Sequence, residues 1–413
     1  MRFIRIDELH PLMSAKPTTS AQNTHWGKVS LALCAGLFVS MQVGKLGPAI
    51  PVLRDDLGLS MVDAGYALSI FTLLAIFLAV PLGAFSTFFG RRSIIVLGIL
   101  SVMIGTLGST VITQPWMFLV LRALEGFGFI AIAVNIPAFI THLAAPQDRT
   151  RALGVWSIYM PTGMAFALLV STPFLTQIGW RGLWIIMFLL ATPLLIGLWW
   201  ALEEPSAQQT REPRAVARMV ANSYRAPGLL MVGACFGVYT FQWVTIMQWL
   251  PSFLNEEVGL SLEHASYFTA AVVFMNGPGC YVGVRFAARG VRSSSLIVIG
   301  AVTMAVLTFA IFGAGVPPLM RLILCMIYSF IGGFIPANLF LLVPQYAPDL
   351  RHVSIGNGIL MQGSAVGQTL GAPIVAALVT QAGGDWDVAI WPMLVMSGCV
   401  FLLGFFGFRR SNL

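Results

Sequence analysis

Charged side chains are scarce in this sequence. Asp, Glu, Lys and Arg make up only 9% of its 413 residues, whereas an ordinary soluble domain carries roughly 25%. Hydrophobic residues make up 57%. This imbalance excludes a soluble enzyme or a soluble binding domain and indicates an integral membrane protein.

The residue patterns of common catalytic and metal sites are also missing. The sequence has no Walker-type Gly-x4-Gly-Lys phosphate loop and no His-Glu-x2-His pair, and His142, His264 and His352 lie far apart. The five cysteines are widely spaced inside apolar runs, and they are Cys34, Cys235, Cys280, Cys325 and Cys399. We therefore expect buried thiols, no metal, no cofactor and no enzymatic activity.

The net charge of +7 raises the possibility of a nucleic-acid partner. The basic residues, however, lie in short loops between apolar runs and form no stripe on a soluble domain, a pattern typical of membrane topology. We expect the lipid bilayer to be a partner and nucleic acid not to be one.

Twelve apolar segments have the length of about 20 residues that a spanning helix needs. In the first half they cover roughly 29–52, 64–85, 93–112, 116–140, 152–176 and 182–200. In the second half they cover roughly 229–254, 262–284, 294–312, 319–346, 354–379 and 388–408. The sequence therefore predicts an all-α membrane protein with twelve transmembrane helices.

The two halves repeat one plan. Residues 55–66, Asp-Asp-Leu-Gly-Leu-Ser-Met-Val-Asp-Ala-Gly-Tyr, return 201 positions later as Glu-Glu-Val-Gly-Leu-Ser-Leu-Glu-His-Ala-Ser-Tyr. Gly83 and Gly90 return as Gly283 and Gly290 at an offset of 200. A period this long indicates duplicated halves, so we expect six helices in each.

The basic residues also predict the orientation. Eighteen of the 23 Lys and Arg residues fall on the side of the two termini, and only Arg54, Arg181 and Arg321 fall on the other side. Positive loops face the cytosol, so we expect both termini to be cytosolic in a bacterial cytoplasmic (inner) membrane. The predicted parts are a tail (1–28), a six-helix bundle (29–200), an exposed linker (201–228), a second bundle (229–408) and a tail (409–413).

The twelve helices, the basic central linker and the loop between helices two and three resemble the major facilitator superfamily. This loop reads Gly-x6-Gly-Arg-Arg over 83–92, and its counterpart contains Gly283, Gly290 and Arg292. The resemblance implies a monomeric transporter that moves a small-molecule substrate by rocking its two halves around a central site. It also implies that the residues of both loops take part in gating, and they are Gly83, Gly90, Arg91, Arg92, Gly283, Gly290 and Arg292. The family's acidic residue in this loop is replaced by Thr87, so we expect the gate to use other contacts.

Further short motifs resemble one branch of that family. Helix four carries Arg122-x3-Gly126-x-Gly128, which is similar to the family's proton-coupling motif. Pro161-x-Gly163, Gly179-Trp180-Arg181 and Trp249-Leu250-Pro251 are similar to sequences of cyanate and nitroimidazole transporters.

Ionisable residues within a bilayer are costly, at about 2.5 to 3.5 kcal/mol each, and three remain inside the predicted spans once the loops and span ends are set aside. They are Lys45, Arg122 and Glu125. At a rise of about 1.5 Å per residue, all three lie at a similar depth. Helices one and four are neighbours in the family, so the resemblance implies that these side chains form one polar cluster.

This cluster has two interpretations. Glu125 carries the coupled proton while Lys45 and Arg122 attract an anionic substrate, or Arg122 and Glu125, at i and i+3, form a purely structural ion pair. Lys45 has the further alternative of extending its amine to water at the interface.

We expect no comparable buried charge in the second half, because Ile246 and Phe330 occupy the places that match Lys45 and Glu125. Its candidate substrate contacts are neutral, and they are Gln242, Trp243, Gln248, Tyr328 and Asn338, with Asn276, Asn357 and Gln362 as further candidates. Each has the alternative of bonding a neighbouring helix.

The favoured function is therefore proton-coupled transport of a small organic or inorganic anion, by symport or antiport. One alternative is proton-driven export of a larger amphipathic compound, such as a drug or siderophore. A membrane sensor that transports nothing is the alternative from another class.

The orientation can be tested with single cysteines at positions 218 and 385. We expect a membrane-impermeant thiol reagent to label the first from the cytosolic side and the second from the outer side. Labelling of both from one side would contradict the twelve-span topology.

Overall fold

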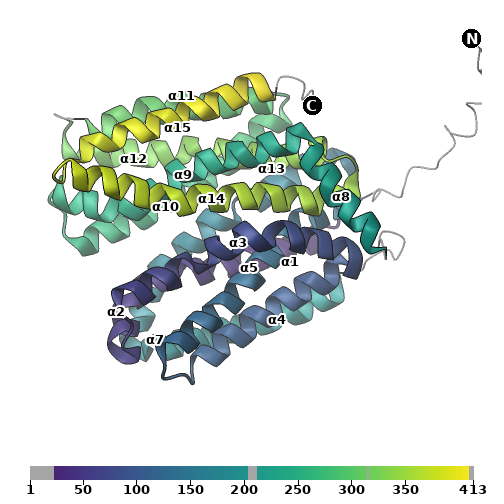
Figure 1. Cartoon of the computed structure of the whole chain (residues 1–413), viewed down its shortest axis with the longest axis horizontal. Coiled ribbons are helices and arrows are strands. Elements are labelled where there is room, and N and C mark those ends of the chain that lie inside the picture. Colours follow the sequence, from purple (N-terminus) through teal and green to yellow (C-terminus); the bar gives the residue numbers. More distant parts are fainter. Residues whose placement is uncertain (1–22, 203–211, 314–315, 409–413) are drawn as a thin grey trace, which may run out of the picture.

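The computed structural model describes residues 23–202, 212–313 and 316–408, in which all the regular elements are helices (Figure 1). The first half comprises α1 (Trp26–Gly44), α2 (Leu46–Leu57), α3 (Met61–Phe89), α4 (Arg91–Ser109), α5 (Pro115–Leu143), η2 (Pro146–Asp148), α6 (Arg149–Ser157) and α7 (Tyr159–Ala201). The second comprises α9 (Pro227–Glu256), α10 (Leu262–Ala288), α11 (Ser293–Phe312), α12 (Pro318–Gly332), α13 (Phe334–Tyr346), η4 (Leu350–His352), α14 (Val353–Gln381), η5 (Trp386–Ala389), α15 (Ile390–Leu402) and η6 (Leu403–Gly407). Helix α8 (Pro213–Arg225) lies between them in the chain.

The helices form two groups that follow the chain. Figure 1 shows the purple and blue helices of the first half on one side and the green and yellow helices of the second half on the other. Within the described residues, eleven helices are long and apolar enough to cross a membrane. Helix α10 has the length of a twelfth, although its middle carries Asn276, Gly277 and Pro278.

Several predicted spans are interrupted where the sequence weakens a helix. The first span is divided at Lys45 into α1 and α2, and the tenth is divided at Gly333 into α12 and α13. The fifth span begins in α6 and continues into α7, which also contains the sixth. Gly179 separates the two arms of α7 with φ 70° and ψ 176°, a conformation that favours glycine.

The repeated Gly-Leu-Ser segment is a helix stop followed by a helix start. Gly58, the C-cap of α2, has φ 68°, and Gly259, two residues past the C-cap of α9, has φ 76°, so both turns use the left-handed region. Ser60 accepts a hydrogen bond from the Asp63 backbone at 3.1 Å and caps α3. Ser261 caps α10 in the same way, so the repeat in sequence is a repeat of capping chemistry.

The second part of the predicted linker over 201–228 is a helix. Residues 213–225 form α8, which packs on α3 and α14 and thus contacts both halves (Figure 1). Met219 and Ser223 are buried, whereas Arg214, Arg218 and Arg225 lie on one exposed stripe. The rest of the predicted linker over 203–211, most of the N-terminal tail and the tail over 409–413 lie outside the described residues.

The two halves are in close contact near the arginine-rich end, which we define as the end that contains Gly90–Arg92, η2, η4 and α8. A Cβ atom added to Gly83 on α3 would lie 2.5 Å from the Ser354 carbonyl oxygen on α14. A Cβ atom on Gly358 would lie 2.6 Å from the Ala79 carbonyl oxygen. These backbones touch because both positions lack a side chain.

Candidate functional site

Lys45, Arg122 and Glu125 form one buried ionic cluster inside the first half. Lys45 lies at the junction of α1 and α2, and the other two lie one turn apart on α5. Lys45 Nζ is 3.0 Å from Glu125 Oε1, and Arg122 Nη1 pairs with Glu125 Oε2. The residues are 0%, 1% and 0% exposed. The carboxylate therefore bridges two cations in a site closed to water.

Neutral polar groups complete this cluster. Lys45 Nζ donates to Gln42 Oε1 at 2.5 Å, and Arg122 Nη1 donates to the Gln42 carbonyl at 3.2 Å. Thr106 Oγ1 on α4 donates to Glu125 Oε1 at 2.7 Å. Ionised side chains at this depth are tolerated only when their partners are provided by the protein, as they are here.

Two aromatic rings cover the cations. Lys45 Nζ lies 4.1 Å from the ring centroid of Trp184 on α7. The Arg122 guanidinium carbon lies 4.3 Å from the ring centroid of Phe71 on α3. The π-face of each ring attracts its cation, and the arrangement excludes the alternative in which the Lys45 amine extends to water in this conformation.

Small residues allow these helices to meet. A Cβ atom on Gly105 would lie 2.8 Å from Glu125 Cγ, so only glycine lets α4 place Thr106 against the carboxylate. A Cβ atom on Gly44 would lie 2.4 Å from the Met164 carbonyl on α7. The described partners of the cluster all belong to α1, α3, α4, α5 and α7, so the cluster is enclosed by the first half.

The buried polar atoms of this site that lack a partner share one property. They are Gln42 Nε2, Arg122 Nε and Trp184 Nε1, and within the described part of the chain none has a hydrogen-bond acceptor. All three are donors. A site with a net charge of +1 and unused donors is suited to a group that carries negative charge and acceptor oxygens.

The neutral candidates of the second half are separated from this cluster. The Gln242 amide is hydrogen-bonded to Ser397 Oγ at 2.7 Å, and Trp243 Nε1 donates to Ser329 Oγ at 3.0 Å. Asn338 Nδ2 donates to the Phe334 carbonyl at 2.8 Å. These three side chains are buried and bond within their own half.

The remaining candidates differ from one another. Gln248 is exposed, and Tyr328 is fully buried with no partner for its hydroxyl among the described residues. Asn276 Nδ2 donates to Tyr239 Oη at 3.0 Å, whereas both side-chain polar atoms of Asn357 lack a described partner. Gln362 Nε2 donates to the Ile76 carbonyl at 2.7 Å and so connects α14 to α3 across the two halves.

The sequence analysis missed one buried charge in the second half. Arg321, in the first turn of α12, is 9% exposed and donates from Nη2 to the Gly313 carbonyl at 3.0 Å. Its guanidinium carbon lies 5.6 Å from the Phe253 ring centroid. The side chain folds back onto the helix end, which explains how a residue predicted to lie at the surface is buried.

Some of the predicted gating residues form the loop turns, and others make contacts between helices. Gly90 and Gly290 have φ 91° and 89°, so both loops need glycine. Arg91 Nε donates to Ser354 Oγ at 3.2 Å and Nη2 donates to the Leu350 carbonyl at 3.3 Å. Arg91 therefore joins the first half to η4 and the start of α14, without the acidic residue that Thr87 replaces.

The other gating residues do not all bridge the halves. Arg92 lies over the Trp199 ring at 4.3 Å within the first half. Gly283 allows close approach to Phe334, whose Cα would be 3.0 Å from an added Cβ, and Arg292 is exposed.

The segment that receives Arg91 is held by a local cap. Asp349 accepts hydrogen bonds from the backbone N–H groups of Arg351 and His352 and pairs with both side chains. Partial burial opposes the charge, but hydrogen bonds from Arg351 and His352 outweigh it and lower the pKa of the Asp349 carboxyl to about 2. A lowered pKa means that the stabilisation is complete above the ordinary Asp range and is lost only as the pH falls towards 2. The cap is therefore present at physiological pH.

Comparison with known proteins identifies the family. The family model described as Major Facilitator Superfamily matches residues 32–356. This chain belongs to the major facilitator superfamily. It is a multi-pass membrane transporter and not an enzyme.

Individual relatives of this transporter are distant. It is 25% identical to the gentisate transporter of Corynebacterium glutamicum over 79% of this chain and 73% of that protein. It is 24% identical to the inner membrane transport protein YajR of Escherichia coli over 63% of this chain and 57% of that protein. The structure of the transporter FucP in the outward conformation aligns with a TM-score of 0.74 at 14% identity, covering 93% of this chain and 99% of that one, and this supports the fold.

The contribution of Thr106 to the cluster can be measured. Thr106→Val keeps the shape of the side chain but removes the donor to Glu125, and a hydrogen bond to a charged group contributes about 1.5–3 kcal/mol. We expect a lower unfolding temperature of the purified transporter, measured by a thermal shift assay. Thr106→Ser keeps the hydroxyl and should stay close to the parent. Equal losses in both variants would show that the hydrogen bond contributes little.

Proposed function

We propose that this transporter moves a small organic or inorganic monoanion together with a proton, across a bacterial cytoplasmic membrane with both termini cytosolic. One observation carries the proposal. The buried cluster holds two cations and one carboxylate, and its unsatisfied polar atoms are all donors. Glu125 is the proton carrier in this scheme, and Lys45 and Arg122 attract the anion.

Charge balance explains why the proton and the anion move together. With Glu125 ionised, Lys45, Arg122 and Glu125 carry a net charge of +1. Protonation of Glu125 raises the net charge to +2, and a bound monoanion restores +1. Because a change in buried charge is costly, the empty carrier and the carrier loaded with both ions are the two forms that reorient most easily. This balance favours symport over transport of the anion alone.

Access of the anion requires the cluster to open. Lys45 and Arg122 are enclosed by the first half in this conformation. An anion can therefore bind them only if it replaces part of their ion pairing with Glu125. Protonation of Glu125 weakens its attraction to both cations, and this frees them for a second negative group. Binding of the proton and binding of the anion are therefore mutually favourable.

The conformation suits the start of such a cycle. The contacts of Gly83, Arg91 and Gln362 join the halves towards the arginine-rich end. In the orientation predicted from the basic residues, this end faces the cytosol, so the transporter is closed on the inside. Reorientation requires these contacts to separate, including the bond from Arg91 to Ser354.

The nature of the anion is supported by two further observations. The relative from Corynebacterium glutamicum is named a gentisate transporter, and gentisate is a carboxylate. The short motifs around Pro161, Gly179 and Trp249 resemble the branch with cyanate and nitroimidazole transporters. A small planar organic acid or inorganic anion is therefore the first class of substrate to test.

The two alternatives are separated from this proposal by one assay. Counterflow in liposomes, run over a panel of small organic anions, siderophores and dyes, should detect exchange of an anion. Exchange of siderophores or dyes alone would indicate an exporter of larger compounds. A folded protein that exchanges none of them would favour the sensor.

Glu125→Gln tests the coupling role. The amide is neutral, as protonated Glu125 is. The loaded carrier therefore keeps its net charge of +1, whereas the empty carrier has a net charge of +2 instead of +1. We expect loss of gradient-driven accumulation and retention of exchange between labelled and unlabelled anion, measured in the same proteoliposomes.

A purely structural ion pair predicts a different outcome for Glu125→Gln. Leaving buried cations without a carboxylate then costs about 3–5 kcal/mol, so yield, thermal stability and exchange should fall together. Accumulation at the parent level would exclude Glu125 as the proton carrier.

Lys45→Met tests the attraction of the anion. The substitution keeps the length of the side chain and removes its charge, so the apparent affinity for the exchanged anion should fall about tenfold or more, which corresponds to about 1.4 kcal/mol. Lys45→Arg keeps the charge and should lose less. An unchanged apparent affinity in Lys45→Met would remove Lys45 from the substrate site.

A further inference from the structure

At the end opposite the arginine-rich end, each half contains a hydrogen bond from a tryptophan indole to a carboxylate. In the first half, Trp180 Nε1 donates to Asp56 Oδ2 at 2.9 Å. In the second half, Trp386 Nε1 donates to Glu256 Oε2 at 2.9 Å. Both carboxylates lie in the repeated segment, one position apart, because at the offset of 201 Asp56 matches Glu257 and Glu256 matches Asp55. Each indole follows the turn after the fifth span of its half.

The local backbone shows that the two interactions are built alike. Each acid lies at the end of a helix and two or three residues before a glycine of positive φ, Gly58 or Gly259, and each indole lies one or two residues after another such glycine, Gly179 or Gly384. A carboxylate at a helix C-terminus is disfavoured by the helix dipole. Its presence at both ends indicates that the bond to the indole offsets this cost.

The bond to Trp180 is part of a small network. Arg181 Nη1 pairs with the same Asp56 Oδ2 at 2.5 Å, and Arg181 Nε donates to the Thr110 carbonyl at 3.1 Å. The hydrogen bond from Trp180 and the contact with Arg181 lower the pKa of the Asp56 carboxyl, so it is an ionised acceptor at neutral pH. The network thereby fixes the end of α2 against α7.

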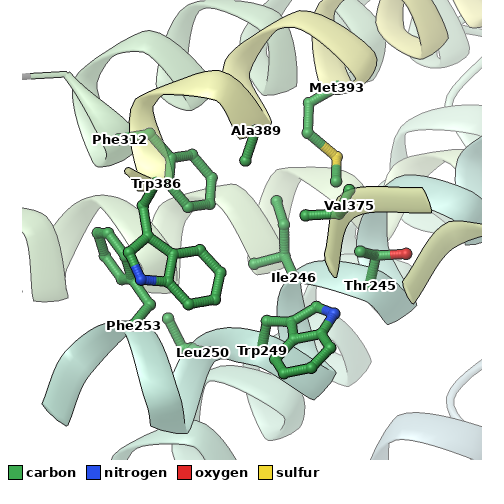
Figure 2. Close-up of a pocket in the computed structure, with 10 residues that line it drawn as sticks. All are labelled: Thr245, Ile246, Trp249, Leu250, Phe253, Phe312, Val375, Trp386, Ala389 and Met393. Atoms are coloured by element: carbon green, nitrogen blue, oxygen red, sulfur yellow. The ribbon is translucent and has the colours of Figure 1, made fainter. Parts of the chain in front are cut away.

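Each indole also packs in an aromatic cluster. Trp180 lies 5.5 Å from Trp184 and 6.4 Å from Phe118, measured between ring centroids. Trp386 lies 5.8 Å from Phe253 and 6.2 Å from Trp249, and Figure 2 shows these three rings around a small apolar cavity. Rigid rings at this spacing transmit the position of one side chain to the next.

The two clusters differ in what lies beneath them. In the first half the Trp184 ring covers the Lys45 amine at 4.1 Å. In the second half the position that matches Lys45 is Ile246, and it lines the same cavity as Trp249 and Trp386 (Figure 2). The common framework therefore holds a charged group in one half and an aliphatic group in the other.

We propose that Asp56 and Trp180 form a positioning strut that sets Trp184 over Lys45 and so keeps the lysine amine on Glu125. Asp56 and Trp180 touch neither the amine nor the carboxylate, and they act through the Trp184 ring. The matching strut of Glu256 and Trp386 supports only packing. The functional importance of the first strut rests on the proposed role of Lys45, but its existence as a positioning device does not.

The proposal can be tested by the chemical reactivity of Lys45. The sequence contains only three lysines, Lys16, Lys28 and Lys45, so peptide mass spectrometry can follow each one. The probe is N-hydroxysuccinimide acetate, applied to the purified full-length transporter at several times of reaction. The rate at Lys45, divided by the rate at Lys28, is a readout that needs no substrate.

Two pairs of matched variants separate positioning from stability. Trp180→Phe and Trp386→Phe each remove an indole N–H bonded at 2.9 Å. Asp56→Ala and Glu256→Ala each remove the acceptor, and Asp56→Ala also removes the ion pair with Arg181. We expect each first-half variant to raise the relative acetylation rate of Lys45 about fivefold or more, the factor for about one net hydrogen bond. The second-half variants should leave that rate within about twofold while lowering the unfolding temperature comparably.

Each outcome decides for or against the strut. An unchanged Lys45 rate in folded Trp180→Phe and Asp56→Ala overturns the proposal. Equal rises in the first-half and second-half variants also overturn it, because they indicate general loosening. If Trp180→Phe does not fold, Asp56→Ala decides alone, since it keeps both rings. Because the labelling is independent of transport, a failure of the anion symport would be seen separately, in the counterflow of the parent protein.

Discussion

The ion pairing of Glu125 with two cations is the interaction on which this transporter depends. A single carboxylate meets Lys45 and Arg122 inside the first half, where all three side chains are shielded from water. Removal of the carboxylate would leave two cations uncompensated in a medium of low dielectric constant. The interaction therefore stabilises the bundle and also makes its charge state sensitive to a proton. In this account, stability and coupling come from the same contacts.

The surrounding fold serves to keep that cluster assembled while the halves move. Gly44 and Gly105 bring α7 and α4 close enough to provide Trp184 and Thr106. The contacts that hold the halves together are of a different kind, since they use glycine backbones and neutral or singly charged hydrogen bonds, as at Gly83 and Arg91. Such contacts are easier to break than the buried ion pairs, so the halves can separate while the cluster survives.

Sequence reasoning found the architecture and the three charges because both depend on local or compositional signals. The apolar runs, the repeat and the rarity of charged residues inside the predicted spans can all be read directly from the sequence. Gln42 was within reach too, since it lies one turn before Lys45 on the same face. Thr106 and Trp184 were not, because their contacts follow from how closely α4 and α7 pack on their neighbours. Helix α8 was missed although Arg214, Arg218 and Arg225 share one helical face, a spacing that indicates an amphipathic helix.

The charge balance of the cycle is the central claim, and the measurement that tests it most directly is the driving force for accumulation. Proteoliposomes would be loaded with buffer, and a labelled monocarboxylate that passes the counterflow assay would be added under an imposed pH gradient or a potassium diffusion potential. If one proton accompanies one monoanion, the accumulation ratio at steady state should rise about tenfold for each pH unit and should not depend on the membrane potential. Accumulation that follows the potential and ignores the pH gradient would contradict the account.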